Sequence, residues 1–378
     1  MGLLTILSRI IVASGLGIYI YGMLILIFRN SRSKKHPESE RFKEHPGNLS
    51  LLLLCLVFLL LMSQIKLTFE YNGTLEMNVN ILVVSIFIGL GITFLISHFV
   101  LKKKSDSSDI IQHVLSSKEP EDFKKYTLLL DIERKSNHLI AFLLALFSIS
   151  VGWITVFILV RYFPSHPEYA YILEKSENFW NRADGTTFLQ NLFNTEIFST
   201  SRTILSITFG GFSLFLLTIE YARLSKKIYF PFQEIVQKQL RWEEKNAIGS
   251  YIYLMMGLAV SSLLLPSMMF LGVASVVSFG DSAASLLGIK FGKKKYPHNN
   301  KTVEGTLIGS FLTLFTVFLF AGIYFAVAAV VVFILIDLIC PNPLKMNDNL
   351  LLPLVLTGVF IILFVLKVPS PNIVEYFI

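Results

Sequence analysis

The sequence predicts an all-α protein, a polytopic transmembrane helical bundle with about ten spans. Of its 378 residues, 53% are hydrophobic and only 16% are charged, whereas a soluble domain carries about 25% charged residues. The mean hydropathy is +0.63, and long apolar runs alternate with basic segments. The net charge of +7 arises from those basic segments, and no nucleic-acid-binding motif accompanies it. We therefore expect the membrane, and no nucleic acid, as a partner.

The expected spans follow the apolar runs in chain order. These runs cover about residues 3–28, 50–66, 80–101, 138–162, 201–221, 250–279, 304–339 and 349–367. The first run is too long for the apolar core of a cleaved signal peptide, so we expect it to be retained. Two runs hold two helices each, because Pro266 breaks one and a turn at Ala321-Gly322 divides the other. We expect residues 1–130 to supply N-terminal helices and basic loops, and residues 131–378 to form a second membrane domain.

The distribution of lysine and arginine predicts which helix ends face the cytosol. Five alternate loops together hold 26 of the 33 basic residues; they cover residues 29–49, 102–137, 222–249, 280–303 and 340–348. Under the positive-inside rule these loops are cytosolic. The sequon at Asn72 then faces the lumen, where glycosylation occurs, whereas the sequon at Asn48 faces the cytosol and stays unmodified.

The stretch from Gly280 to Gly305 combines glycine, acid and base more densely than any other part of the chain. Its glycines are Gly280, Gly288, Gly292 and Gly305, and its lysines are Lys290, Lys293, Lys294, Lys295 and Lys301. Glycines allow a positive φ and a close approach of backbone N–H groups to an anion. We interpret the stretch as a phosphate-binding loop that is not a Walker A loop. A basic loop that only marks the cytosolic face is the alternative.

Two acids and a threonine complete this stretch. Asp281 and Glu304 offer hard oxygen ligands to Mg²⁺, which usually binds through one or two carboxylates plus substrate phosphates. Thr302 precedes Val303-Glu304, which predicts the start of a helix whose N-terminus faces an anion.

Three further polar clusters are expected at the same membrane face. Residues 133–138 begin the fourth helix, Glu220 ends the fifth, and Asp348-Asn349 begins the last. An acid within an apolar helix end is costly and is usually paired or functional, which singles out Glu220. The other clusters have simpler interpretations: Arg134 and Lys135 as interfacial anchors, His138 as an ordinary hydrogen-bonding residue, and Asp348 as part of a helix N-cap.

Together these residues resemble a known family, the CTP-dependent polyprenol kinases, which includes the dolichol, phytol and CTP-dependent diacylglycerol kinases. The matching segments are Gly280-Asp281-Ser282-Ala283-Ala284-Ser285, Gly288, Gly292 and Lys301-Thr302-Val303-Glu304-Gly305. Three others look most like the dolichol kinases: Asp348-Asn349-Leu350-Leu351-Leu352-Pro353, Glu220-Tyr221-Ala222-Arg223, and Arg134-Lys135 with His138. The resemblance covers about residues 130–367 and leaves the first three helices without an assigned role. A more distant similarity connects the family to the phosphatidate cytidylyltransferases.

The resemblance implies transfer of the γ-phosphate of CTP to the terminal hydroxyl of dolichol in the endoplasmic reticulum membrane. The product, dolichyl phosphate, carries sugars for protein glycosylation. The implied ligands of the divalent metal, Mg²⁺, are Asp281 and Glu304. The implied nucleotide site comprises Gly280, Ser282, Gly288, Gly292, Lys293, Lys294, Lys295, Lys301, Thr302 and Gly305. Asp348, Glu220 or His138 would orient or deprotonate the alcohol.

Two other functions remain open from the sequence. The first is a sister enzyme that phosphorylates phytol or diacylglycerol with CTP, or that forms a CDP-lipid from phosphatidate. The second is a transporter or channel with a basic cytosolic loop, which predicts acids in the middle of helices along a pore. The acids recognised here lie instead at one interface, which favours the enzyme.

Overall fold

The computed structural model describes residues 17, 20–24, 27–28, 45–64, 123–162, 200–225, 240, 247–299 and 301–369. Within these residues the chain forms nine α-helices and one π-helical segment, and the single β-type pairing is an isolated bridge between Lys295 and Thr302. The predicted all-α class is therefore confirmed for this part of the chain. The predicted span at 80–101, most of the first span and the sequon at Asn72 lie outside the described residues, so a total of ten spans stays a prediction.

The helices are named in chain order. They are α2 (Pro46–Gln64), α5 (Phe123–Tyr162), α8 (Thr200–Ser225), α10 (Ser250–Leu264), α11 (Ser267–Ser275), the π-helical segment η4 (Val276–Gly280), α12 (Asp281–Phe291), α13 (Val303–Ala321), α14 (Ile323–Ile339) and α15 (Asp348–Val365). Four helical stretches are long and apolar enough to cross a membrane: Asp131–Gly152, Ser267–Phe291, Val303–Ala321 and Asp348–Val365. The described residues thus supply four candidate membrane spans.

Both predicted breaks in the apolar runs are confirmed. Pro266 is the N-cap of α11, directly after α10, because the proline ring cannot continue the preceding helix. Gly322 separates α13 from α14 and has a φ of 86°, which only glycine adopts without strain.

The interpretation of residues 280–305 as one loop is wrong for its first half. The chain stays helical from α11 through η4 into α12, which ends at Phe291. Residues 281–291 contain two alanines, two leucines and a lysine, which favour a helix, and no proline. The connection between α12 and α13 is therefore limited to residues 292–302, of which 292–299 and 301–302 are described and are called the lysine loop below.

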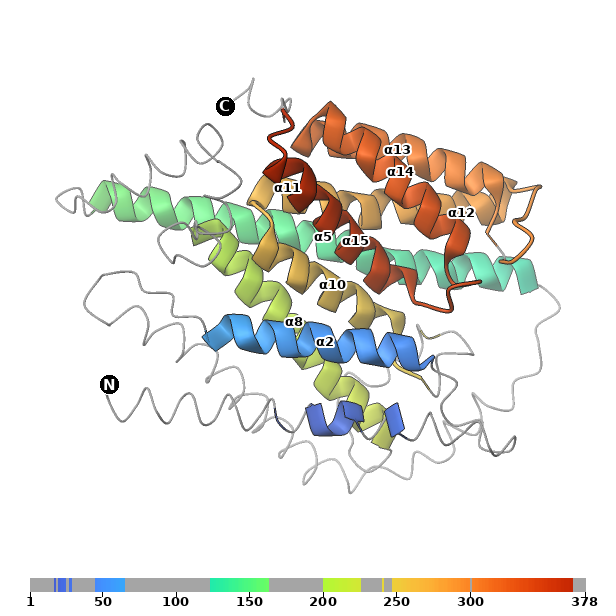
Figure 1. The fold of residues 1–378 in the computed structure, drawn as a ribbon, viewed down its shortest axis with the longest axis horizontal. Coiled ribbons are helices and arrows are strands. Elements are labelled where there is room, and N and C mark those ends of the chain that lie inside the picture. The colour runs from blue at the N-terminus through green and yellow to red at the C-terminus, as the bar shows by residue number, and fades with distance from the viewer. Residues whose placement is uncertain are drawn as a thin grey trace.

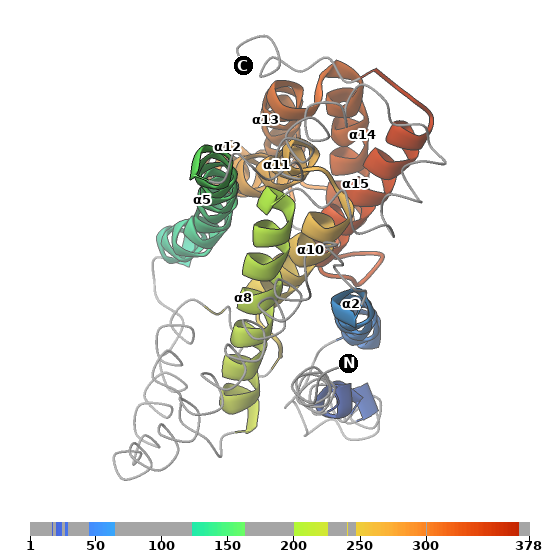
Figure 2. The same ribbon diagram turned by 90° about the vertical axis from the view of Figure 1, so that its left-hand side faces the viewer.

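The core of the bundle lies around α10 and α11. Helix α11 packs against α5, α8, α13 and α15, and α10 packs against α2, α8 and α15 (Figures 1 and 2). Phe270 of α11 meets Phe209 of α8 edge to face, with ring centroids 5.3 Å apart. Large apolar side chains, among them Phe147, Phe311 and Phe315, are exposed on the outer faces of α5 and α13. Such outward apolar faces are compatible with surrounding lipid rather than water.

The polar ends of the helices gather at one end of the bundle. The start of α5 and the connection from α12 to α13 lie at the right-hand side of Figure 1. Polar contacts join this end across the sequence: Lys301 to Asp348, Arg134 to Ser250, and Asn48 to the backbone N–H of Asn347. The predicted clusters around Arg134, Lys301 and Asp348 thus lie at one end of the bundle, and the membrane face that this end occupies stays a prediction.

Candidate functional site

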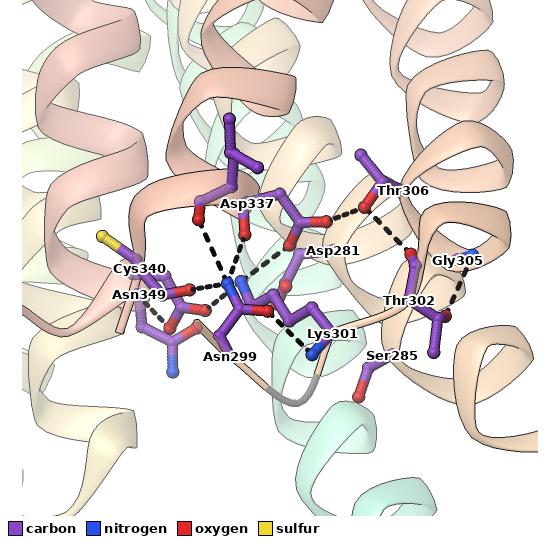
Figure 3. Close-up of polar contacts among 12 residues, drawn as sticks. Asp281, Ser285, Asn299, Lys301, Thr302, Gly305, Thr306, Asp337, Cys340 and Asn349 are labelled. Atoms are coloured by element: carbon purple, nitrogen blue, oxygen red, sulfur yellow. Dashed lines mark hydrogen bonds and ion pairs between the residues drawn. The ribbon is translucent and has the colours of Figure 1, made fainter. Parts of the chain in front are cut away.

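Several groups of paired polar side chains, here together called the polar cluster, lie at this end of the bundle. Its members are Asp131, Arg134, Lys135, His138, Asp281, Ser285, Asn299, Lys301, Thr306, Asp337 and Asp348. They come from α5, α12, the lysine loop, α13, α14 and α15, and Figure 3 shows the part around Lys301.

Lys301 lies where three helix ends meet. Its Nζ is 2.7 Å from Asp337 Oδ1 and 2.8 Å from Asp348 Oδ2. Its backbone N–H donates to Asn299 Oδ1 at 2.9 Å, which fixes the backbone beside the ammonium group (Figure 3). Burial alone would lower the pKa of Lys301, but the carboxylates of Asp348, Asp337 and Asp281 outweigh burial and hold that pKa above its usual value. The ammonium group therefore stays charged and bridges two acids.

Asp348 is the more open of these two acids. Its side chain is 28% exposed, against 5% for Asp337. The interpretation of Asp348 as the N-cap is wrong, because Asn347 is the N-cap of α15 and its side chain accepts the Asn349 N–H at 3.0 Å. Asp348 is instead the first helical residue, which frees one carboxylate oxygen for Lys301.

Asp281 meets α5 at the junction between the π-helical segment and α12. It is buried and forms an ion pair with Lys135, and its Oδ2 is 3.7 Å from His138 Nδ1. His138 Nδ1 is also 3.0 Å from the carbonyl oxygen of Val277, which can only accept, so Nδ1 carries the proton. The Ser278 hydroxyl donates to the His138 carbonyl at 2.6 Å. The π-helical segment thus holds α5 beside Asp281, in line with the frequent occurrence of such segments at functional sites.

Arg134 and Lys135 are mostly buried rather than placed as interfacial anchors. Their side chains are 12% and 11% exposed. Arg134 donates to the Ser250 hydroxyl at 2.7 Å and lies 3.5 Å from Asp131, which in turn accepts a hydrogen bond from the Ser285 hydroxyl. Both basic side chains therefore connect α5 to other helices, and the anchor interpretation is not supported.

Glu220 belongs to a separate buried group at the end of α8. Its carboxylate pairs with Arg223 and accepts hydrogen bonds from the Gly249 N–H at 2.8 Å and the Tyr251 hydroxyl at 2.5 Å. Arg223 also donates to the carbonyl of Ala247. Glu220 is 1% exposed, and these contacts join α8 to the start of α10 rather than to Lys301 or Asp281.

The glycines of the predicted nucleotide site serve close packing between α12 and α13. A Cβ on Gly305 would collide with the carbonyl oxygen of Ala284, and one on Gly280 would collide with the Thr313 hydroxyl. Gly288 faces Gly305, and a Cβ on Gly292 would meet Thr302. None of these four glycines adopts the positive φ that glycine allows, because among the described glycines only Gly322 has one. Small residues let the two helices approach closely.

Two hydroxyl residues of the predicted nucleotide site differ in their surroundings. Thr302 is the N-cap of α13, as predicted, and its hydroxyl accepts the Gly305 N–H at 3.2 Å. The Ser282 hydroxyl is buried and, within the described part of the chain, has no hydrogen-bond partner. Thr302 thus supports the helix start, whereas Ser282 has capacity left for another group.

Glu304 holds the lysine loop. Its carboxylate accepts the backbone N–H groups of Lys293, at 3.1 Å, and Lys294, at 3.2 and 3.3 Å. The Val303 N–H donates to the Lys294 carbonyl at 2.9 Å, which closes the loop. The side chains of Lys293, Lys294 and Lys295 point outward and are exposed.

The donor set fits a magnesium ion at Asp281 better than at Glu304. Among the described residues, no group of three or more His, Cys, Asp or Glu side chains is placed to hold a metal ion. A Mg²⁺ ion shared with phosphates needs only one or two carboxylates, so Asp281 would be sufficient. Because Gly288 faces Gly305, Glu304 lies about two helical turns further along α12 than Asp281. Joint binding of one ion by Asp281 and Glu304 is therefore not supported.

Sequence reasoning missed four members of the polar cluster: Asp131, Asn299, Thr306 and Asp337. Asp337 and Asp131 are buried acids, and Asn299 donates to the carbonyl groups of Asp337, Leu338 and Cys340 (Figure 3). Asp337 carried a usable signal, since it is the single charged residue in the apolar run 304–339 after Glu304. Asn299 carried none, because an asparagine in a polar loop is ordinary.

Comparison with known protein families, with curated protein sequences and with solved structures found no match to this chain.

Proposed function

We propose that this protein is a CTP-dependent lipid kinase that transfers the γ-phosphate of CTP to the terminal hydroxyl of dolichol. One observation carries the proposal. The segments that resemble the polyprenol kinases are far apart in sequence, yet Lys135, Asp281, Lys301 and Asp348 belong to one polar cluster. A basic loop that served only as a topology signal would not require its Lys301 to be paired with acids from two other helices.

In the proposed reaction, the chain supplies positioning and charge. Phosphoryl transfer depends mainly on positioning the reactants and on neutralising charge. A magnesium ion held by Asp281 would neutralise charge on the phosphates. Lys301 and Lys135 place two ammonium groups near Asp281, where they would bind phosphate oxygens as the γ-phosphate moves to the alcohol.

Asp348 is the best candidate to orient the alcohol. His138 is buried and its Nδ1 proton is used by Val277, while Glu220 is engaged by Arg223 and Tyr251. Asp348 keeps a partly exposed carboxylate beside Lys301. The alcohol oxygen attacks the γ-phosphorus, the bond to the β,γ-bridging oxygen breaks, and CDP leaves. The alcohol proton passes to Asp348.

The proposed location is the endoplasmic reticulum membrane, with the polar cluster facing the cytosol. Four candidate spans and the exposed apolar faces of α5 and α13 support residence in a bilayer. A long isoprenoid chain would lie in lipid beside these helices while its hydroxyl reaches the polar end. CTP would come from the cytosol.

A labelling experiment tests this proposal. Detergent-purified protein is incubated with Mg²⁺ and with CTP or ATP labelled at the γ-phosphate, and dolichol, phytol and diacylglycerol are offered separately. Label transferred from CTP to dolichol supports the proposal, and transfer to another alcohol redirects the substrate. Label from α-labelled CTP in a lipid derived from phosphatidate would indicate CDP-lipid synthesis instead. No transfer from either nucleotide would contradict a kinase.

A further inference from the structure

Asp337 is an acid near the end of an otherwise apolar helix, and the reaction described above does not use it. The side chain is 5% exposed. Its Oδ1 accepts from Lys301 Nζ at 2.7 Å, and its Oδ2 accepts from the Thr306 hydroxyl. An acid in such a helix is costly unless its partners compensate, so this complete pairing points to a specific role.

The two partners of Asp337 lie at the start of α13: Thr306 belongs to its first turn, and Lys301 precedes the N-cap Thr302 in the lysine loop. Asn299, in the lysine loop, binds the same helix end: its Nδ2 donates to the carbonyl oxygens of Asp337 and Leu338 at 3.2 Å each. The end of α14 is thus fixed to both sides of Lys301 (Figure 3). Asp348 reaches the same ammonium group from α15 but remains considerably more open.

We infer that Asp337 is a positioning residue that holds the Lys301 ammonium group beside Asp348 and near Asp281. It acts on phosphoryl transfer only through Lys301 and does not touch the nucleotide or the alcohol. This inference rests on the proposed kinase function. Without Asp337, Lys301 would be held by Asp348 alone and would lose the fixed position from which it can bind a phosphate.

A double-mutant cycle in kcat tests this dependence. Asp337→Asn and Lys301→Ala are each expected to lower kcat, by roughly 100-fold for a misplaced catalytic group. If Asp337 acts through Lys301, the double variant is no slower than Lys301→Ala. Asp131→Asn is the matched control, because Asp131 is also buried and accepts from a hydroxyl but pairs with Arg134. In the variant that combines Asp131→Asn with Lys301→Ala, the fold-losses in kcat of the two single changes should multiply, whatever the size of the first.

Several results would overturn the inference. A kcat for Asp337→Asn equal to that of the wild type would overturn it. So would a double variant whose fold-loss in kcat equals the product of the losses of Asp337→Asn and Lys301→Ala. If Asp337→Asn does not fold, Thr306→Val removes only the hydroxyl that orients Asp337, and the same cycle is measured with it.

A second readout separates this inference from the kinase proposal. A water-soluble amine reagent should modify Lys301 more extensively in Asp337→Asn than in the wild type, measured by mass spectrometry with Lys290 as internal reference. If no lipid alcohol is phosphorylated but Lys301 becomes more reactive, the kinase proposal fails while the positioning contact stands. If the wild type is active and Lys301 is no more reactive in Asp337→Asn than in the wild type, Asp337 is not the group that holds Lys301.

Discussion

The charges inside the polar cluster and the exposed lysines of the lysine loop have opposite surroundings. Lys301 is 24% exposed and lies between Asp337 and Asp348. Lys293, Lys294 and Lys295 are exposed and, within the described residues, form no ion pair. The backbone of the loop is nevertheless well held by Glu304. Residue type alone therefore does not distinguish a lysine of the site from a surface lysine; burial and acidic partners do.

This difference assigns different energetic roles to the two groups. A buried, hydrogen-bonded charge is costly to leave without its partner, whereas an exposed charge is largely screened by water and salt. Changes inside the polar cluster should therefore affect turnover strongly, and changes on the surface of the loop should affect it weakly.

The largest effect is expected from Asp281→Asn. If Asp281 binds Mg²⁺ shared with the CTP phosphates, the amide cannot neutralise the metal, and turnover should be abolished while the protein remains folded in detergent. Mn²⁺ or a higher Mg²⁺ concentration should recover a little activity. Melting temperature and specific activity are measured on one preparation. A lower melting temperature with near-wild-type turnover would instead make Asp281 only the ion-pair partner of Lys135.

The next largest effect is expected from Lys301→Ala, compared with Lys290→Ala. A buried phosphate contact made in the transition state contributes about 2–4 kcal/mol, or roughly 30- to 1,000-fold in rate. Lys290 is exposed and lies 5.1 Å from the centroid of the Phe291 ring, so its removal should change the rate little. Initial rates with dolichol and CTP give both values. Equal, mild losses at the two positions would mean that burial does not separate these lysines functionally.

Gly305→Ala tests the packing that supports the lysine loop. The new Cβ would collide with the Ala284 carbonyl on α12, which cannot move without shifting that helix. We expect a loss of stability of about 1–3 kcal/mol, seen as a lower melting temperature in detergent. Gly358→Ala is the control, because Gly358 is helical and has open space around its Cα. It should be neutral or stabilising by up to about 1 kcal/mol. Similar melting temperatures for both variants would refute close α12–α13 packing at Gly305.

A smaller effect is expected from Lys293→Gln. An exposed charge contact is worth about 0.2–1 kcal/mol, so the KM for CTP should rise by roughly 1.5- to 5-fold with little change in kcat. The difference should shrink as salt concentration rises, because screening weakens exposed contacts. KM is measured at low and high ionic strength. A large, salt-independent fall in kcat would place Lys293 inside the catalytic site and remove the contrast with Lys301.

Much of the fold could be predicted because apolar runs, Pro266 and Gly322 are local signals. Composition predicted the all-helical class, and both breaks lie where expected. The helix 281–291 was missed because glycines on either side of it suggested a loop. Their function is long-range: Gly280 and Gly288 accommodate α13, and no local rule shows which helix a glycine will face.

The site was only partly predictable for the same reason. Asp281, Lys301 and Asp348 carry motif signals and belong to one cluster. Glu304 shares its motif with Lys301, but its carboxylate binds the backbone of the loop. Asp337 becomes important only once α14 is folded against α13, because its partners come from α13 and from the lysine loop before it.

The last prediction concerns membrane sidedness, and the sequon variants that test it should leave turnover unchanged. The proposed use of CTP by Lys301 and Lys293 requires that the polar end face the cytosol. Asn48 lies at this end, where its side chain accepts the Asn347 N–H at 2.8 Å, so it should not be glycosylated, whereas Asn72 should be. Single-sequon variants treated with a glycosidase show which asparagine carries a glycan. A shift from Asn48 and none from Asn72 would place the polar cluster in the lumen.

Cysteine labelling gives an independent measure of the same orientation. The two native cysteines, Cys55 and Cys340, are both buried, so a cysteine introduced by Lys293→Cys should be the reactive one. In sealed microsomes, whose outer face is cytosolic, a membrane-impermeant maleimide should label this variant without detergent. Labelling only after permeabilisation would put the lysine loop on the luminal side, away from CTP. Since a kinase that draws CTP from the cytosol cannot work from that side, this outcome would contradict the proposed reaction as well as the orientation.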